Sequence, residues 1–166
     1  MLIFKSAATC VNVQKLDLTC AANPKVSKVP GLKRKTFSYA IANFSDQRVY
    51  LSGGQNEAGK LVSYFDLVSH TWHDAPQLNE ARLSHASICL GNSVYAFCGF
   101  KTGSIEALKV AEGQRWQMIH KATAKLTRAC PALTVLNDHC IVMYGGSHNG
   151  WLNDGMVIDT KKMSVK

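Results

Sequence analysis

The sequence lacks long apolar runs, helical periodicity and any recognisable catalytic motif. No apolar stretch among its 166 residues approaches the roughly 20 residues that a membrane-spanning helix needs. No segment sustains a 3.6-residue apolar period between a cap and a stop, so helices are not expected. Phosphate loops, nucleophile elbows and paired carboxylates are also missing. The sequence therefore predicts neither a membrane protein nor an enzyme.

Metal-ligand spacing is absent as well. The six cysteines show no metal-knuckle pattern, and the six histidines show no ligand spacing. No metal and no cofactor are therefore predicted. Cysteines inside apolar segments are most simply small buried thiols, which suit a reducing compartment. Because Met1 opens no secretory signal, a cytoplasmic location is predicted. The cysteines in apolar segments are Cys89, Cys98, Cys130 and Cys140.

What the sequence does contain is an internal repeat of 46 residues. Residues 82–100 read as two short apolar strands joined by a Gly-Asn turn and followed by a glycine. The same arrangement occurs 46 residues upstream and 46 residues downstream. Such a period predicts small antiparallel sheets arranged radially. The equivalent positions are Gly53, Gly99 and Gly145, and also Thr36, Arg82 and Arg128.

The repeat divides the chain into four units, of which the two in the middle are complete. Each full unit predicts four short antiparallel strands, and the outer units hold three each. The predicted units are a partial one over 1–35 (second to fourth strands), full ones over 36–81 and 82–127, and a partial one over 128–166 (first to third strands).

These residues resemble kelch repeats, the units of kelch-type β-propellers. The family pattern is a strand ending in a glycine pair, an acidic residue on the next strand, a tryptophan, and an arginine that opens the next unit. Gly99-Phe100 replaces the glycine pair in one unit, and Val165 falls where the last unit should have its tryptophan. The residues that match, and whose expected roles are structural, are Gly53, Gly54, Asp66, Trp72, Arg82, Gly99, Trp116, Arg128, Gly145, Gly146 and Asp159.

The resemblance implies an all-β fold, a kelch-type β-propeller with four-stranded antiparallel blades. At 46 residues a unit the chain holds about 3.6 units, whereas propellers usually close with about four to eight blades. A partial or few-bladed propeller is therefore expected. Two interpretations stay open: a fragment of a longer propeller, or two copies that self-associate through open blade edges to complete a ring.

The predicted loops carry the functional hypothesis. In a four-stranded blade the second-to-third loop and the blade-to-blade connection emerge at the same end. The chain has a net charge of +8, and its basic residues gather in these segments. Such a concentration of positive charge would steer an acidic protein partner. The alternative is a solvated rim that only aids solubility. The predicted partner-binding residues are Lys33, Arg34, Lys35, Lys60, Lys101, Lys125 and Trp151.

Two further expectations concern the partner. Nucleic acid is not favoured, because the basic residues lack interleaved aromatic side chains. Trp151 is either an interface anchor or a side chain folded back over its blade. The sequence thus predicts a non-catalytic protein-protein interaction module or scaffold. The alternatives are a sugar-handling enzyme on the same fold and a non-functional fragment of a longer kelch protein.

Overall fold

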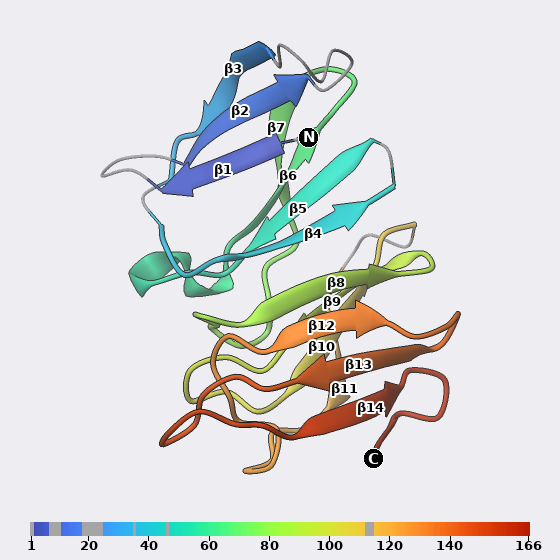
Figure 1. Ribbon diagram of the computed structural model, residues 1–166. Coiled ribbons are helices and arrows are strands. Elements are labelled where there is room, and N and C mark those ends of the chain that lie inside the picture. The colour runs from blue at the N-terminus through green and yellow to red at the C-terminus, as the bar shows by residue number, and fades with distance from the viewer. Residues whose placement is uncertain (1, 7–10, 18–24, 35, 46, 112–114) are drawn as a thin grey trace.

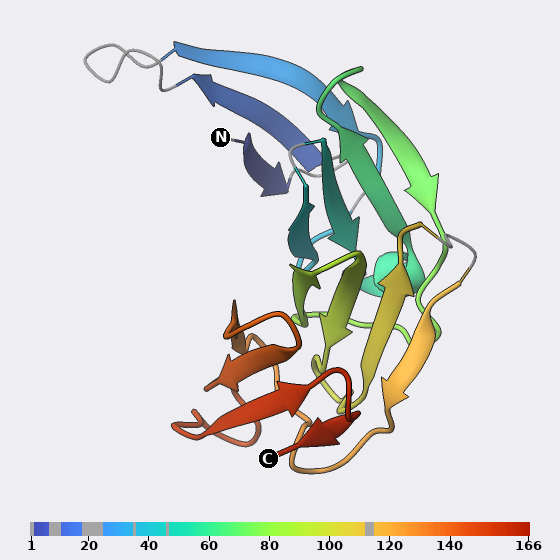
Figure 2. The same cartoon turned by 90° about the vertical axis from the view of Figure 1, so that its right-hand side faces the viewer.

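Four antiparallel sheets follow one another along a curve, in the order of the sequence (Figures 1 and 2). The computed structural model describes residues 2–6, 11–17, 25–34, 36–45, 47–111 and 115–166. Three of the sheets have four strands and one has three. The prediction of an all-β fold with four-stranded antiparallel sheets is confirmed. No described helix has the length and apolarity needed to cross a membrane.

Each sheet is a meander, in which neighbours in sequence are neighbours in space. The first contains β1 (Leu2–Ser6), β2 (Val11–Asp17) and β3 (Lys25–Leu32). The second contains β4 (Ala40–Phe44), β5 (Arg48–Ser52), β6 (Val62–Asp66) and β7 (Thr71–Ala75). The third contains β8 (Ala86–Leu90), β9 (Ser93–Phe97), β10 (Ile105–Lys109) and β11 (Gln117–His120). The fourth contains β12 (Ala132–Val135), β13 (Cys140–Tyr144), β14 (Gly155–Asp159) and β15 (Ser164–Val165).

The fourth sheet has one strand more than the three expected of residues 128–166. The short strand β15 pairs with β14, placing Val165 opposite Ile158. The turn between them is held by Asp159, whose Oδ1 accepts the backbone N–H groups of Lys161 and Lys162 at 3.0 and 2.9 Å. An acidic side chain at this position therefore fixes the turn that makes a fourth strand reachable.

One short helix lies where none was expected. The 3-10 helix η1 (Asn56–Lys60) lies in the loop between β5 and β6. Its last turn is closed by Leu61 N–H, which donates to Ala58 O at 3.0 Å. Ala58 and Gly59 are buried, so packing stabilises a single turn too short to show helical periodicity in the sequence.

The hydrophobic core lies between sheets rather than within one. One cluster joins the second and third sheets and includes Tyr50, Val62, Val94, Leu108 and Trp116. A second cluster joins the third and fourth sheets and is made of Phe97, Cys98, Ile105, Leu126, Ile141, Met143, Met156 and Ile158. The second, third and fourth sheets therefore bury apolar faces against one another, as radially stacked blades do.

Two tryptophans link each of their sheets to the preceding one. Trp116 Nε1 donates to Pro76 O at 2.8 Å, and Trp72 Nε1 donates to Pro30 O at 2.9 Å. Each ring thus covers the flank of its own sheet while its N–H reaches the chain before it. In the fourth sheet Val165 lies opposite Ile158, just as Trp72 lies opposite Phe65 in the second sheet. Valine has no N–H in its side chain, so the fourth sheet lacks this hydrogen bond to the preceding chain.

The glycine pair of the third sheet lies one residue earlier than expected. Gly53 and Gly54 have φ of 62° and 125°, and in the third sheet Cys98 and Gly99 have 57° and 128°. The third-sheet equivalent is thus Cys98-Gly99, and the expected Gly99-Phe100 pair is wrong. Gly145 and Gly146, at 64° and 94°, complete the series. A Cβ on Gly54 would collide with Thr36 Oγ1, so the second position of the pair requires glycine.

Backbone hydrogen bonds join one sheet to the next near these pairs. Ser84 N–H donates to Ser38 O at 2.8 Å, and Cys130 N–H donates to Ser84 O at 2.6 Å. All three residues have positive φ, of 59°, 51° and 51°. We call this series the inter-sheet ladder. It runs in one direction along the curve, with each sheet donating to the sheet before it.

Candidate protein-binding face

The loops that follow each second strand and the connections between sheets come together at one end of the sheets, on the left in Figure 1. We call this end the loop face. It comprises the turns β5–β6, β9–β10 and β13–β14 with the connections that lead into β4, β8 and β12. Backbone bonds tie these segments together: Phe100 N–H donates to Leu83 O at 2.9 Å, and Gly99 N–H donates to Arg128 O at 3.0 Å. The loops therefore form one surface rather than separate tips.

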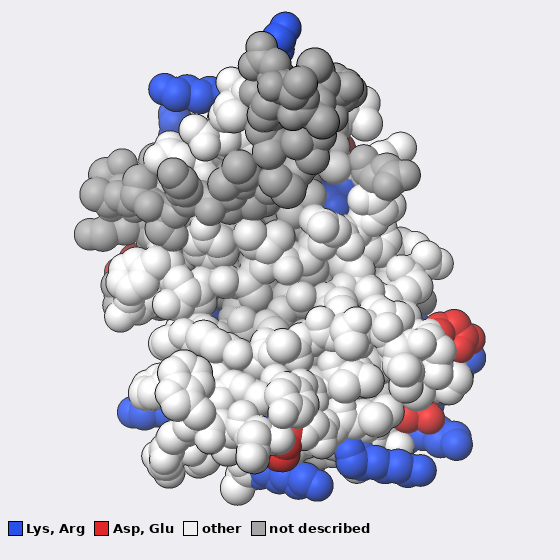
Figure 3. All heavy atoms as spheres, in the orientation of Figure 1, with Lys and Arg blue, Asp and Glu red and all other residues white. Residues whose placement is uncertain are grey.

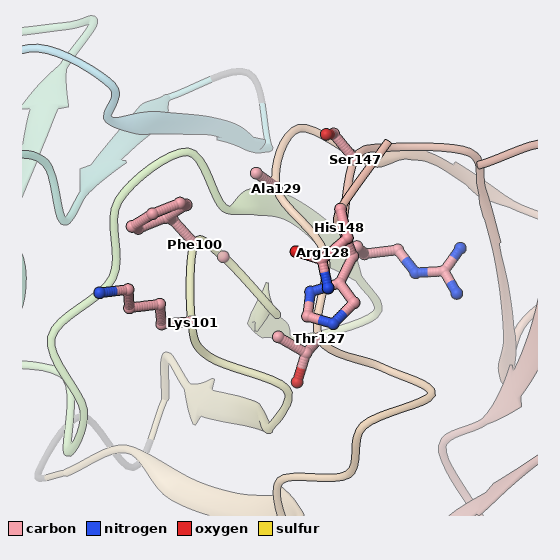
Figure 4. Close-up of a pocket in the computed structure, with 9 residues that line it drawn as sticks. Phe100, Lys101, Thr127, Arg128, Ala129, Ser147 and His148 are labelled. Atoms are coloured by element: carbon pink, nitrogen blue, oxygen red, sulfur yellow. The ribbon is translucent and has the colours of Figure 1, made fainter. Parts of the chain in front are cut away.

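A hollow of about 330 Å³ opens in this face between the third and fourth sheets. In Figure 4, Phe100 and Lys101 form one wall, and Thr127, Ala129 and His148 form the other. Phe100 keeps 54% of its surface exposed, and Lys101 Nζ lies 5.3 Å from the centre of its ring. The ammonium group is attracted by the electron-rich face of the ring, and aromatic side chains are enriched in protein interfaces.

Arg128 belongs to the wall of the hollow, but its charge is turned away from it (Figure 4). Its Nη1 and Nη2 bind Asp154 Oδ1 and Oδ2 at 2.8 and 3.1 Å, and Nη1 also donates to Gly145 O at 3.0 Å. Hydrogen bonds from Arg128 lower the pKa of Asp154. The repeat arginine thus fastens the connection to the glycine pair and is unavailable to a partner.

Arg82 plays the equivalent role one sheet earlier, in a fully buried ion pair. Its Nη2 lies 2.9 Å from Glu106 Oε1, and neither side chain is exposed to solvent. Nη1 donates to Cys98 O and Ser104 O at 2.8 and 2.9 Å. Glu106 also accepts the backbone N–H and the side-chain amide of Asn79, each at 2.7 Å. The carboxylate and the guanidinium thereby satisfy each other and the surrounding backbone.

The lysines predicted to bind a partner are exposed. Lys33, Lys60, Lys101 and Lys125 all reach solvent, whereas Lys35 lies outside the described residues. In the view of Figure 3, Lys and Arg side chains lie at the margins of the described surface and its middle is uncharged. On the face shown in Figure 3, the described basic groups therefore surround an uncharged centre and do not cover it.

Arg34 is half-buried beside a second hollow, of about 380 Å³, between β3 and the ends of β6 and β7. Its Nε and Nη2 are buried and without a hydrogen-bond partner. Burial lowers the pKa of Arg34, an effect that the charge of Asp74 opposes. Two N–H groups on one edge of a guanidinium have the geometry to donate to both oxygens of a carboxylate.

Trp151 does not fold back over its sheet. Its side chain is 89% exposed, and it lies in the β13–β14 turn, where Ser147 and Trp151 form an isolated bridge. Ser147 lines the first hollow, so the loop that carries Trp151 also forms part of the wall of that hollow. The sequence pointed to this ring because it falls outside the repeat. It did not reveal Phe100 as a second exposed aromatic ring on this face.

One histidine near the loop face is buried. His85 Nε2 lies 2.8 Å from Ser52 Oγ, and its Nδ1 has no partner. Burial, and to a smaller extent the nearby charge of Arg82, lower the pKa of His85 to about 3. The ring is therefore neutral at physiological pH and belongs to the packing between sheets. Among the described residues, the one group with metal-ligand geometry lies at the opposite end, at His139, Cys140 and Asp159.

No protein-family model matches the chain. A stretch of 91 residues, 53% of the chain, is 29% identical to Kelch-like protein 26 of zebrafish (Danio rerio). The similarity fits kelch repeats. The matched part spans 15% of that protein's length. The four-stranded antiparallel sheets are likewise consistent with kelch-type propeller blades.

Proposed function

We propose that the chain is a kelch-type module that binds a partner protein through the loop face and does so without catalysis. The observation that carries this proposal is the pairing of two exposed aromatic rings with a hollow. Phe100 lines the hollow, and Trp151 extends from the loop that forms its other side. Exposed aromatic anchors beside a pocket are typical of the centre of a protein interface. The name of the zebrafish relative supports a kelch-like architecture.

The partner that fits this face is acidic. Lys60, Lys101 and Lys125 are exposed around it, whereas the unpaired Nε and Nη2 of Arg34 are buried beside the adjoining hollow. Arg82 and Arg128 are neutralised by Glu106 and Asp154 and add little to this field. Charges placed around an interface chiefly raise the association rate and orient the partner. We therefore assign the aromatic rings to affinity and the lysines to steering.

A cytoplasmic location accords with the described thiols. Cys89, Cys98, Cys130 and Cys140 are free. The expectation of a buried thiol is wrong for Cys130, which is exposed because it precedes β12 instead of lying inside a strand. Burial raises the pKa of Cys89 and of Cys98 to about 12, so these two sulfurs are protonated and unreactive. Free buried thiols are the usual state of cysteine in a reducing compartment.

Reversing the charge of Lys60, Lys101 and Lys125 together to glutamate is expected to weaken partner binding at least about 10-fold at low salt, because electrostatic steering raises association rates by about 10-fold to 1,000-fold. The matched control reverses Lys109, Arg115 and Lys162, which lie at the other end of the sheets. The measurement is quantitative capture of the partners that the wild-type chain retains, at low and high salt. Equal losses in the two triple variants would refute an oriented docking face.

Trp151→Ala is expected to reduce partner affinity by about 2 kcal/mol or more, the usual effect of truncating an interface anchor. Its effect on thermal stability should stay within about 0.5 kcal/mol, because the ring is exposed. Trp116→Ala is the contrasting variant: its ring is 2% exposed, and its loss should cost about 3–5 kcal/mol of stability. Unchanged capture by the Trp151 variant would remove this ring from the interface.

A further inference from the structure

Three different metal-binding side chains meet at the end of the fourth sheet that lies opposite the loop face. The donor atoms of His139, Cys140 and Asp159 all lie within 4.8 Å of one another. Cys140 and Asp159 are direct cross-strand partners at the ends of β13 and β14. His139 immediately precedes β13. The cluster is partly shielded from water, since Cys140 is buried and the other two are half-buried.

The surroundings of the cluster hold two of these donors in place. His139 Nδ1 lies 2.6 Å from Asp138 Oδ1, which leaves Nε2 as the ring nitrogen for a metal. A carboxylate on the far nitrogen is the usual outer support of a metal-bound histidine, because it fixes the ring and raises its basicity. Asp159 Oδ1 accepts the backbone N–H groups of Lys161 and Lys162, so the carboxylate is anchored. Cys140 is a free thiol.

We propose that His139, Cys140 and Asp159 bind one Zn²⁺ ion, with water in the fourth position. An imidazole, a thiolate and a carboxylate form a mixed N/S/O set that suits zinc. Bond lengths of about 2.0–2.3 Å require the three donors to close in by a small side-chain movement. The thiol of Cys140 loses its proton to solvent when the metal binds.

Among the second, third and fourth sheets, the fourth alone has these donor residues at the positions that the repeat makes equivalent. The cross-strand partners corresponding to Cys140 and Asp159 are Arg48 and Asp66 in the second sheet, and Ser93 and Lys109 in the third. Neither pair could bind zinc. The fourth sheet is also the one with a two-residue outer strand and with valine in place of the tryptophan. A metal joining β13 to β14 would therefore stabilise the sheet with the weakest outer packing.

The site was missed from the sequence because its ligands come from two strands. Asp159 follows Cys140 by 19 residues, with β13, the β13–β14 turn and β14 between them. Adjacent His139 and Cys140 form no metal-knuckle spacing. Only the register of the β13–β14 pair brings the carboxylate to the thiol.

Titration of the metal-free full chain with Co²⁺, a visible-absorbing substitute for zinc, tests the proposal. We expect one equivalent to bind, with thiolate-to-cobalt charge-transfer absorption that Zn²⁺ abolishes by displacement. Cys140→Ser should remove the charge-transfer band. Asp138→Asn, which weakens the outer support of His139 and also the contact of Asp138 with Lys161, should weaken affinity about 10-fold to 100-fold. Cys130→Ser, an exposed cysteine of the same sheet, is the matched control and should bind as wild type.

Stability provides a second readout that does not depend on colour. Zinc should raise the melting temperature of the wild-type chain, a chelator should reverse the rise, and Cys140→Ser should show neither effect. Asp159→Asn retains an oxygen for the turn N–H groups while losing the anionic ligand, so it should fold and bind metal more weakly. Absence of a saturable single equivalent, or a charge-transfer band that persists in Cys140→Ser, would overturn the proposal.

Discussion

Glu106→Leu is expected to destabilise the chain by about 3–5 kcal/mol, because it leaves the Arg82 guanidinium buried without its counter-ion. Neither side chain of this pair is exposed. The carboxylate also holds two N–H groups of Asn79 at 2.7 Å and Glu80 N–H at 3.2 Å, all of which lose their acceptor. A loss of this size is a large part of the roughly 5–15 kcal/mol that stabilises a typical domain. Urea unfolding followed by circular dichroism measures it.

Two comparisons separate an uncompensated charge from lost packing. Arg82→Met combined with Glu106→Leu should cost less than the sum of the single changes, because no charge is left buried alone. Asp154→Asn weakens the equivalent pair made by Arg128. The Asp154 carboxylate is 48% exposed, so this change should cost much less stability than Glu106→Leu. Equal losses from Glu106→Leu and Asp154→Asn would contradict the view that burial makes the Arg82–Glu106 ion pair the more important of the two for stability.

Acidification from about pH 6 to about pH 4.5 is expected to lower the free energy of unfolding by about 2 kcal/mol through His85 alone. The pKa of this ring is about 3 in the folded chain, because burial penalises the charged form. It is near 6.5 when the chain unfolds. Between these values the unfolded state binds a proton that the folded state does not. Stability from neutral His85 is therefore complete above about pH 6.5 and is lost as the pH falls toward 3.

His85→Gln should flatten this pH dependence, since glutamine does not titrate. His148→Gln, on the exposed loop face, is the control and should leave the dependence as in wild type. Measurements stop near pH 4.5 because carboxyl groups whose pKa is lowered by hydrogen bonds, such as Asp66 and Asp159, lose their own contributions at more acid pH. A wild-type stability that stays constant over this range would show that His85 takes up its proton without cost.

The period of the sequence predicted the sheets because strand alternation, turns and glycines all recur with it. Single positions were less predictable. Cys98 has a φ of 57°, close to the 62° of Gly53 at the equivalent position. A cysteine in the sequence does not indicate this left-handed conformation. Its side chain is fully buried, with Sγ 3.6 Å from Met143 Sδ. Packing against the fourth sheet offsets a backbone strain of about 1–3 kcal/mol, so contacts distant in sequence decided this residue.

The loop face was predictable as a location and much less so in its chemistry. Strand direction alone places these loops at one end. Charge counts could not show that Arg82 and Arg128 are neutralised, because Glu106 and Asp154 follow them by 24 and 26 residues and meet them only through the register of the sheets. The hollow beside Phe100 likewise depends on the conformation of three loops, which no periodic pattern specifies.

The inter-sheet ladder gives the arc of sheets a chemical polarity. Ser84 donates to Ser38, and Cys130 donates to Ser84. To extend the series, the Ser38 end would donate its backbone N–H, and the Cys130 end would accept at its carbonyl oxygen. A further sheet that continues the curve must bring a backbone N–H to Cys130 O. Two copies meeting by like ends would oppose two acceptors or two donors. An assembly that continues this ladder, within one chain or between chains, therefore joins its sheets head to tail.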